Sequence, residues 1–385
     1  MPRNARVFTT TVSCALAAVL ATGGGAYGGS PSLAGVPLPS LHPASPPSAP
    51  QLPVGRAPLL PTKSGASSAT PSTPSTPAVA DVTASSAPPY SFSWYPNDSD
   101  LKNASTAIKN MGVNAPSHPN QLVFLEVGGW CTSNSTHIDP YSGTCSESAS
   151  ESYTVAYDLE WYMYGYETSG SHAQQQSMGV VATTNNSVAG SNTTNANAQG
   201  RYWEGAVNAN LEAYANTLNN YNASNGLPLT FYAESGNDLE TNFGGPAPAI
   251  DWVNGFNAVD SAGIGMEDNG AYYGTCASAG CWNTPLDHGW SAAQKYHTSW
   301  GATDDFGFPE IYNSGWATYY RDLDAAAAAV GSAANYGVPV WDGVMWGCGT
   351  GGNEPNAPSA WADFANAVSQ SPSYLTYLHA LSKSC

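Results

Sequence analysis

Acidic side chains recur close to the ends of the apolar segments of this sequence, where two carboxyl groups could perform acid–base and nucleophilic chemistry. They are Glu126, Asp158, Glu160, Glu234, Glu267, Asp268, Glu310 and Asp342. A buried carboxylate is costly without a partner, and only six Lys or Arg residues follow Tyr90, so most of these acids cannot form ion pairs. We therefore expect the acids to converge on one site. The alternative is that each acid caps the next helix or pairs with a base.

Aromatic side chains follow four of these acids closely. They are Trp130 after Glu126, Trp161 and Tyr162 after Glu160, Tyr312 after Glu310, and Trp346 after Asp342. Flat aromatic faces stack on sugar rings, and carboxylates accept hydrogen bonds from sugar hydroxyls. Core packing is the alternative for any single Trp. The repeated pairing of an acid with an aromatic residue favours a carbohydrate site.

Two carboxyl groups on either side of a glycosidic bond are sufficient to hydrolyse it, one as a proton donor and the other as a nucleophile or base. We expect Glu160, Glu234 and Glu310 to provide this catalytic chemistry. The substrate-binding residues that we expect are Glu126, Trp130, Asp158, Glu267, Asp268, Tyr312, Asp342 and Trp346.

Helices and strands alternate along the second half of the chain. Helices are expected over residues 201–222, 249–260, 291–300 and 316–335, each followed by an apolar strand over 227–235, 263–268, 305–312 or 338–346. The acids in these strands are 33, 43 and 32 residues apart, which fits one strand and one crossover helix per repeat. Such repeats predict a parallel sheet with helices outside it.

Four earlier segments also read as strands: residues 91–96, 122–130, 154–165 and 178–184, with a short helix near 100–111. Residues 154–165 alternate with period two, and two terminal helices are expected over 359–382. The total of eight strands predicts an α/β protein with a (β/α)8 TIM-type barrel. The connection between the third and fourth strands is too short for a standard crossover helix, so we expect an irregularity there.

The first ninety residues differ in composition from the rest. Arg3 and Arg6 precede an apolar run and then small residues, which is the pattern of a secretory signal peptide over residues 1–29. Residues 30–89 are rich in Pro, Ser and Ala and predict a disordered linker. The barrel domain is expected over 90–385. A membrane anchor at the N-terminus is the alternative, but its apolar stretch is short for a span.

The cysteine count agrees with export. Without Cys14, six cysteines remain, and an even number in an exported chain predicts disulfides. Fifteen pairings are possible, and proximity in sequence favours three of them: Cys131 with Cys145, Cys276 with Cys281, and Cys348 with Cys385.

Charge and motif content exclude several classes of function. The chain has 28 acidic and 10 basic residues and a formal net charge of −18, which disfavours nucleic acid and anionic lipid as partners. No serine-hydrolase elbow, zinc motif, P-loop or dinucleotide fingerprint occurs in a suitable context. The acidic stretch at 236–240 could bind calcium, but its spacing is not that of an EF-hand. We expect no metal and no cofactor.

The chain resembles the secreted glycoside-hydrolase-like (β/α)8 barrels of actinobacteria over roughly residues 90–347. Its YDLEWY segment resembles the strand-end D-x-E of glycoside hydrolase families 18 and 25, which would place Asp158 and Glu160 in the acid–base region. The full D-x-x-D-x-D-x-E run of family 18 is missing, and the D-x-E comes too early for the usual fourth strand. Glu310, on the seventh expected strand, lies where many retaining barrels carry their nucleophile.

The sequence therefore predicts a secreted, monomeric glycoside hydrolase that acts on a polysaccharide, outside the cell or at the cell wall, with no membrane insertion of the mature chain. The main alternative is a non-catalytic carbohydrate-binding or cell-surface protein on the same scaffold. A hydrolase of another polymer, such as a peptidase or esterase, is a third option.

Overall fold

A computed structural model describes residues 90–379 of the protein, except 116–120, 132–137, 140–148, 170–176, 187–192, 261–265, 269, 273, 275, 301–304, 332–342, 348–355 and 370–373. All of the described residues belong to one compact unit, His42–Cys385. The expected signal peptide and linker lie outside the described residues. Within the described residues, no helix is long and apolar enough to span a membrane.

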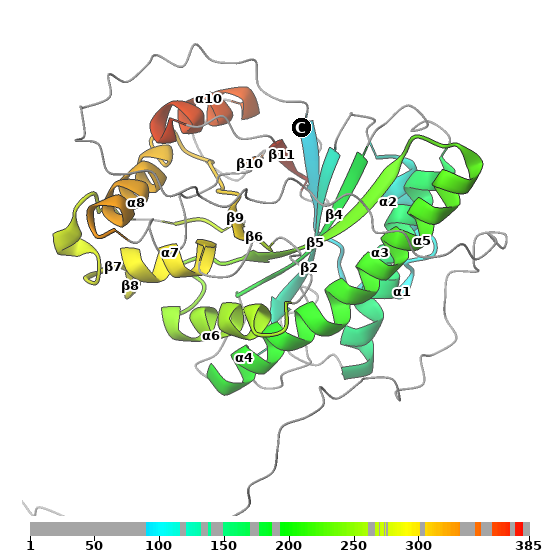
Figure 1. The fold of residues 1–385 in the computed structure, drawn as a ribbon, viewed down its shortest axis with the longest axis horizontal. Coiled ribbons are helices and arrows are strands. Elements are labelled where there is room, and N and C mark those ends of the chain that lie inside the picture. Colours follow the sequence, from blue (N-terminus) through cyan, green and yellow to red (C-terminus); the bar gives the residue numbers. More distant parts are fainter. Residues whose placement is uncertain are drawn as a thin grey trace, which may run out of the picture. The chain divides into compact units, whose positions relative to one another are not determined.

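The described part of the chain alternates strands with helices, drawn from cyan to red in Figure 1. The strands of its main sheet are β1 (Tyr90–Trp94), β2 (Gln121–Trp130), β3 (Ile138–Asp139), β4 (Ser177–Asn185), β5 (Thr230–Asp238), β6 (Met266–Asp268), β9 (Asp305–Gly307), β10 (Gly343–Gly347) and β11 (Tyr374–His379). A separate hairpin consists of β7 (Pro285–Asp287) and β8 (Trp290–Ser291).

The helices are α1 (Asp98–Lys102), α2 (Ala107–Val113), α3 (Ala149–Thr168), α4 (Thr193–Tyr202), α5 (Ala209–Asn225), α6 (Pro246–Asn257), α7 (Ala292–Trp300), α8 (Ala317–Ala329) and α10 (Ala357–Val368). A π-helical turn, η1 (Trp203–Asn208), joins α4 to α5, and a 3-10 turn, η2 (Ala279–Cys281), precedes the hairpin. Local signals define several helix ends. Asn97 caps α1 with a capping box, Pro246 begins α6, and Gly226 at φ 66° ends α5.

Eight strands of the described residues pair in parallel, in the order β10-β11-β1-β2-β4-β5-β6-β9, while β3 pairs antiparallel with β2. The fold is therefore α/β with a parallel sheet, consistent with a TIM-type barrel. Beyond β9, Glu310 forms a parallel bridge with Met345 of β10. The amide of Ile311 donates to the Met345 carbonyl, and the Met345 amide donates to the Pro309 carbonyl.

Alternate residues of the strands face two separate layers of apolar side chains. One small cluster contains Leu122, Phe124, Val181, Phe308 and Met345, with Tyr232 packed against it. Residues one position along each strand, such as Val123, Leu125, Val180 and Ala182, belong instead to the larger core shared with the helices. Glu126, Glu234 and Glu310 therefore lie on the same strand faces as the small cluster, because successive side chains alternate between faces.

Two expectations about elements are wrong. Residues 154–165, expected as a strand, form the middle of helix α3, and β4 is consequently the third parallel strand in sequence. The second of the two expected terminal helices is instead strand β11, which pairs with β1 and β10. The other expected strands and helices are confirmed where the structure describes them, and β5 continues three residues beyond its expected end.

Candidate active site

Glu310 is an almost completely buried acid of the candidate site. It follows β9, its side chain is 2% exposed, and its backbone is fixed by the bridge to Met345. Its Oε1 atom accepts a hydrogen bond from the hydroxyl group of Tyr312, two residues on. Its carboxyl group also shares a side-chain hydrogen bond with that of Glu240.

Asp238 and Glu240 lie at the end of β5. Asp238 is the last residue of the strand and is buried, and Glu240 follows two residues later and is partly exposed. The side chain of Asn186, just after β4, fixes the backbone of Glu240 from both sides. Its Oδ1 atom accepts from the Glu240 amide at 3.1 Å, and its Nδ2 atom donates to the Glu240 carbonyl at 3.0 Å. This arrangement positions Glu240 independently of its own side chain.

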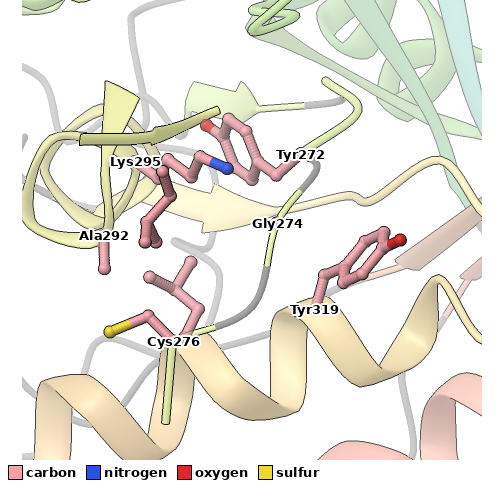
Figure 2. A pocket seen from close by; sticks show the side chains of 8 residues that line it. Tyr272, Gly274, Cys276, Ala292, Lys295 and Tyr319 are labelled. Atoms are coloured by element: carbon pink, nitrogen blue, oxygen red, sulfur yellow. The ribbon is translucent and has the colours of Figure 1, made fainter. Parts of the chain in front are cut away.

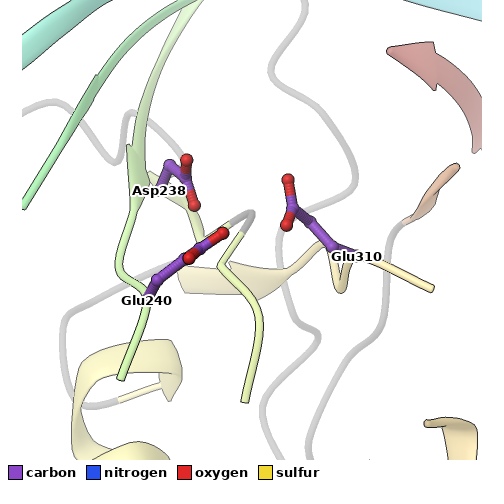
Figure 3. A group of neighbouring side chains, drawn as sticks. All are labelled: Asp238, Glu240 and Glu310. Atoms are coloured by element: carbon purple, nitrogen blue, oxygen red, sulfur yellow. The ribbon is translucent and has the colours of Figure 1, made fainter. Parts of the chain in front are cut away.

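The carboxyl groups of Asp238, Glu240 and Glu310 converge. One oxygen atom from each lies within 4.8 Å of the others, and Figure 3 shows the three side chains pointing toward one another from two elements. Burial, followed by the negative charges of Glu240 and Glu126, raises the pKa of Glu310 well above its usual range, while the Tyr312 hydrogen bond acts in the opposite direction. Burial also raises the pKa of Glu240. Glu310 is therefore the group best suited to hold a proton at neutral pH.

Two further side chains border this acidic centre. Glu126 of β2 is fully buried, and its Oε1 atom accepts a hydrogen bond of 3.1 Å from the Ser93 hydroxyl group on β1. Burial and the negative charge of Glu126 raise the pKa of Tyr95, which follows β1. The register of β2 shifts directly after Glu126, where Gly128 adopts φ 111°, a conformation that favours glycine.

The two other predicted catalytic residues are not part of this centre. Glu160 lies with Asp158 on helix α3, so the strand-end position expected for both is wrong. Glu160 lies close to helix α5, as its effect on Tyr214 shows. Burial and then the negative charge of Glu160 raise the pKa of Tyr214 on that helix. Glu234 faces the same side of β5 as Asp238 but lies four residues earlier, about 13 Å deeper along the strand.

Two predicted sugar platforms pack inside the protein instead. Trp130 is 0% exposed and stacks on Trp252 of α6, with ring centroids 6.4 Å apart. Trp346 is partly buried against the core between the sheet and helices α8 and α10. Its neighbour Met345, on the opposite strand face, is the residue that joins the small inner cluster. The sugar-binding roles expected for both residues stay predictions.

The remaining predicted residues stay predictions. Glu267 and Asp268 form the end of β6, and the roles expected for their side chains are untested. Asp342 lies outside the described residues. The disulfide between Cys276 and Cys281 is confirmed, with a Cα–Cα distance of 5.9 Å, and Cys131 is also disulfide-bonded. The pairings expected for Cys145, Cys348 and Cys385 lie outside the described residues.

A second hollow lies apart from the carboxyl groups (Figure 2). Its lining consists of Tyr272, Gly274, Cys276, Leu286, Ala292, Lys295, Tyr319 and Leu323. Burial lowers the pKa of Lys295 to about 8, and its Nζ atom lies 5.8 Å from the centroid of the Tyr272 ring. The negative charge of Asp287 favours the protonated amine. These neighbours account for Lys295 as a buried structural cation.

Sequence reasoning missed Tyr95, Asn186, Asp238 and Glu240 as site residues. One signal could have found two of them, because the tripeptide Asp-Leu-Glu occurs twice in this chain, at 158–160 and at 238–240. Only the second copy stands at the end of a strand, which is the position that the D-x-E resemblance requires. The sequence placed this second copy in an acidic loop, because the strand before it was expected to end at residue 235.

Comparison with known proteins found one similar solved structure and no matching family or curated sequence. No family model matches the chain, and no curated protein matches it. Among solved structures, the chain is similar to the hyperthermostable endo-1,4-beta-D-mannanase from Thermotoga petrophila RKU-1, solved with maltose and glycerol. The sequence identity is 13%, the match covers 75% of this chain and 87% of that chain, and the TM-score is 0.32.

Proposed function

We propose that this protein is a glycoside hydrolase that cleaves a polysaccharide with a carboxyl pair at the mouth of a (β/α)8 barrel. The eight parallel strands follow one another in cyclic sequence order, with β10 and β11 placed before β1, and the Glu310–Met345 bridge links the segment after β9 to β10. We infer that this bridge closes the sheet into a barrel. Asp238, Glu240 and Glu310 then stand at the carboxyl ends of strands, where barrel enzymes carry their active sites.

The observation that carries this proposal is the convergence of three carboxyl groups within 4.8 Å. Glycosidases that retain anomeric configuration hold their two carboxyl groups about 5–5.5 Å apart, and inverting enzymes need about 6.5–9.5 Å to admit a water molecule. The smaller gap favours a double displacement, in which one carboxylate attacks the sugar and the other group protonates the leaving oxygen. We therefore propose a retaining reaction.

Burial assigns the two roles. Glu310 is 2% exposed, and burial together with the negative charges of Glu240 and Glu126 disfavours its ionised form. We therefore propose it as the proton donor. Glu240 is partly exposed and its backbone is held by Asn186, so it is the proposed nucleophile. Asp238 and Glu126 would keep the pKa of the donor high and accept hydrogen bonds from sugar hydroxyl groups.

Export agrees with these proposals. The Cys276–Cys281 disulfide fits a protein that works in an oxidising compartment. We propose that residues 1–29 direct export and that the Pro- and Ser-rich residues 30–89 act as a spacer that could hold the domain at a cell wall.

Substitution of the two acids tests the proposal. After a polysaccharide panel has identified a cleaved substrate, Glu310→Gln and Glu240→Gln are compared on that polymer and on a dinitrophenyl glycoside of the same sugar. Dinitrophenolate leaves without protonation, so Glu310→Gln should lose about 10³-fold or more in kcat on the polymer but far less on the aryl glycoside. Glu240→Gln should lose activity on both substrates. NMR of the first product formed should show the retained anomer.

Asp363→Asn is the control, because Asp363 is exposed on α10 and the substitution makes the same change of charge. It should leave both activities and the melting temperature unchanged. If the wild-type protein binds a polysaccharide but releases no reducing ends from any member of the panel, the protein is a carbohydrate-binding protein and the catalytic proposal is wrong.

A further inference from the structure

The loop between β5 and α6 continues past Glu240 and carries an exposed aromatic side chain, Phe243. We propose that the Phe243 ring is a platform on which one pyranose ring of the glycan stacks beside the carboxyl centre. This inference rests on the proposed function and adds a sugar-binding position to the same site. Flat aromatic faces pack well on the apolar C–H faces of sugar rings.

The loop touches the carboxyl centre directly. Asn242, the residue before Phe243, is exposed, and its side-chain amide donates a hydrogen bond to the carboxyl group of Glu240. The backbone amide of Phe243 donates to the Glu240 carbonyl at 3.2 Å. Since the Glu240 side chain points toward the other two carboxyl groups (Figure 3), both loop residues lie beside the same cluster.

Exposure to solvent is concentrated on this side of the centre. The carboxyl groups of Glu126, Asp238 and Glu310 belong to buried residues, whereas Glu240 is partly exposed. The two residues of the loop that follow Thr241 are both exposed. A glycan that reaches Glu240 from solvent therefore comes into contact with this loop.

The hairpin of β7 and β8 holds the loop on both sides of Phe243. The hydroxyl group of Thr241 donates to Asp287 of β7 at 2.5 Å, and the indole of Trp290 in β8 donates to the Gly244 carbonyl at 2.8 Å. A ring on a loop that is fixed in this way has little backbone freedom to lose when a sugar binds, so more of the contact energy contributes to affinity.

The position of Phe243 distinguishes it from other exposed apolar side chains. Of the described residues, three large hydrophobic side chains are exposed, and Phe243, at 39%, is the aromatic one. A single exposed apolar side chain is ordinary by itself, so its place in the fold decides its interpretation. Phe243 follows the carboxyl end of β5, where barrel enzymes bind their substrates. Leu227 is equally exposed, at 38%, but it precedes the same strand.

Binding of neutral hexasaccharides to the full chain tests the inference without requiring turnover. The probes are the β-1,4-linked hexamers of glucose, xylose, mannose and N-acetylglucosamine, because the acidic centre would repel an anionic glycan. Calorimetry identifies the hexamer that the wild-type protein binds most tightly. Phe243→Ala should weaken its binding by about tenfold or more, because the apolar contact with one sugar ring is lost. Phe243→Trp keeps a flat ring and should retain the wild-type affinity or exceed it.

Leu227→Ala is the matched control, because it removes an equally exposed apolar side chain at the other end of β5. It should leave the affinity unchanged. Absence of binding of all four hexamers by the wild-type protein, an unchanged affinity in Phe243→Ala, a loss in Phe243→Trp as large as that in Phe243→Ala, or equal effects of Phe243→Ala and Leu227→Ala would overturn the inference.

The proposed function is read separately, from the release of reducing ends. Release of reducing ends together with an unchanged affinity in Phe243→Ala would overturn the platform alone. Loss of affinity in Phe243→Ala, with no cleavage of any polysaccharide by the wild-type protein, would overturn the catalytic function alone.

Discussion

At the scale of single residues, the candidate site depends on the opposition between burial and hydrogen bonding at Glu310. Burial and neighbouring acids favour its neutral form, and the hydroxyl group of Tyr312 favours its ionised form. A retaining hydrolase needs both states in turn, because the donor of the first step must act as the base of the second. Tyr312 is therefore better described as a positioning residue for Glu310 than as a sugar platform.

Tyr312→Phe tests this description. The substitution removes the hydrogen bond that stabilises the ionised form of Glu310, so the pKa of Glu310 rises further and its proton is retained to higher pH. We expect the alkaline limb of the kcat–pH profile to move to higher pH, and kcat at the optimum to fall about tenfold. A fall in kcat with an unmoved alkaline limb would contradict the assignment. Tyr319→Phe, beside the second hollow, is the matched control and should change neither quantity.

The sequence pointed to buried acids near strand ends, but it did not identify all the acids that the structure brings together. Glu126, Glu310 and Tyr312 were expected at one site because they lie in or just after apolar strands, and the charge of Glu126 and the hydroxyl group of Tyr312 both act on the pKa of Glu310. Glu234 was chosen over Asp238 because hydrophobicity stops before residue 235, whereas pairing with β4 continues to Asp238. The polar residues of that extension are held by backbone hydrogen bonds to a neighbouring strand, which a single-sequence pattern does not reveal.

At the scale of elements, helix α3 shows why a pattern of period two can mislead. Its partly exposed positions are Asp158, Trp161, Tyr164 and Glu167, which recur every three residues along one helical face. Most of the other positions are buried, so apolar and aromatic side chains alternate by coincidence. Strand β11 shows the opposite case, since Leu375 and Leu378 have helical spacing but the segment pairs with β1 and β10. Tertiary pairing decides both elements.

Close helix packing on the outside of the sheet depends on pairs of glycines. A Cβ atom at Gly200 of α4 would overlap the carbonyl oxygen of Trp252 on α6, and a Cβ at Gly255 of α6 would overlap that of Asn197 on α4. The two helices lie side by side in Figure 1. These contacts are between backbones and cannot be relieved by a change of side-chain rotamer.

Gly200→Ala should therefore lower the free energy of unfolding by about 1–3 kcal/mol, because the two helices must separate. Gly205 provides a matched control in η1, because it is exposed and a Cβ there would have no neighbour within 4 Å. Gly205→Ala should leave stability unchanged or raise it by up to about 1 kcal/mol. Urea denaturation measures both, and equal effects of the two substitutions would show that α4 and α6 are less closely packed than described.

At the scale of the whole molecule, the buried acidic side chains make the stability of the protein depend on pH. The chain has a net charge of −18, and several of its carboxyl groups are buried away from the candidate site. Burial, reinforced by Asp158, raises the pKa of Glu160 from 4.5 to about 8. Burial also raises the pKa of Glu204 in η1 to about 7, although a hydrogen bond from Asn208 opposes it. Both groups are ionised at pH 4.5–7 more readily in the unfolded chain than in the folded one.

The folded state therefore binds more protons than the unfolded state in this range, so stability should be highest near pH 4.5 and fall as the pH rises through 7 and 8. Glu160→Gln cannot ionise and should recover about 1–3 kcal/mol of unfolding free energy at pH 8 while changing little at pH 4.5. The exposed Asp363→Asn should leave the pH dependence unaltered. Urea denaturation across this range measures the slopes, and parallel curves for wild type and Glu160→Gln would mean that Glu160 is ionised in the folded protein. In a Glu160→Gln, Glu204→Gln double variant, the raised pKa values of Glu167, Glu240 and Glu310 should still lower stability as the pH rises. The lowered pKa of His297 should partly oppose this remaining slope.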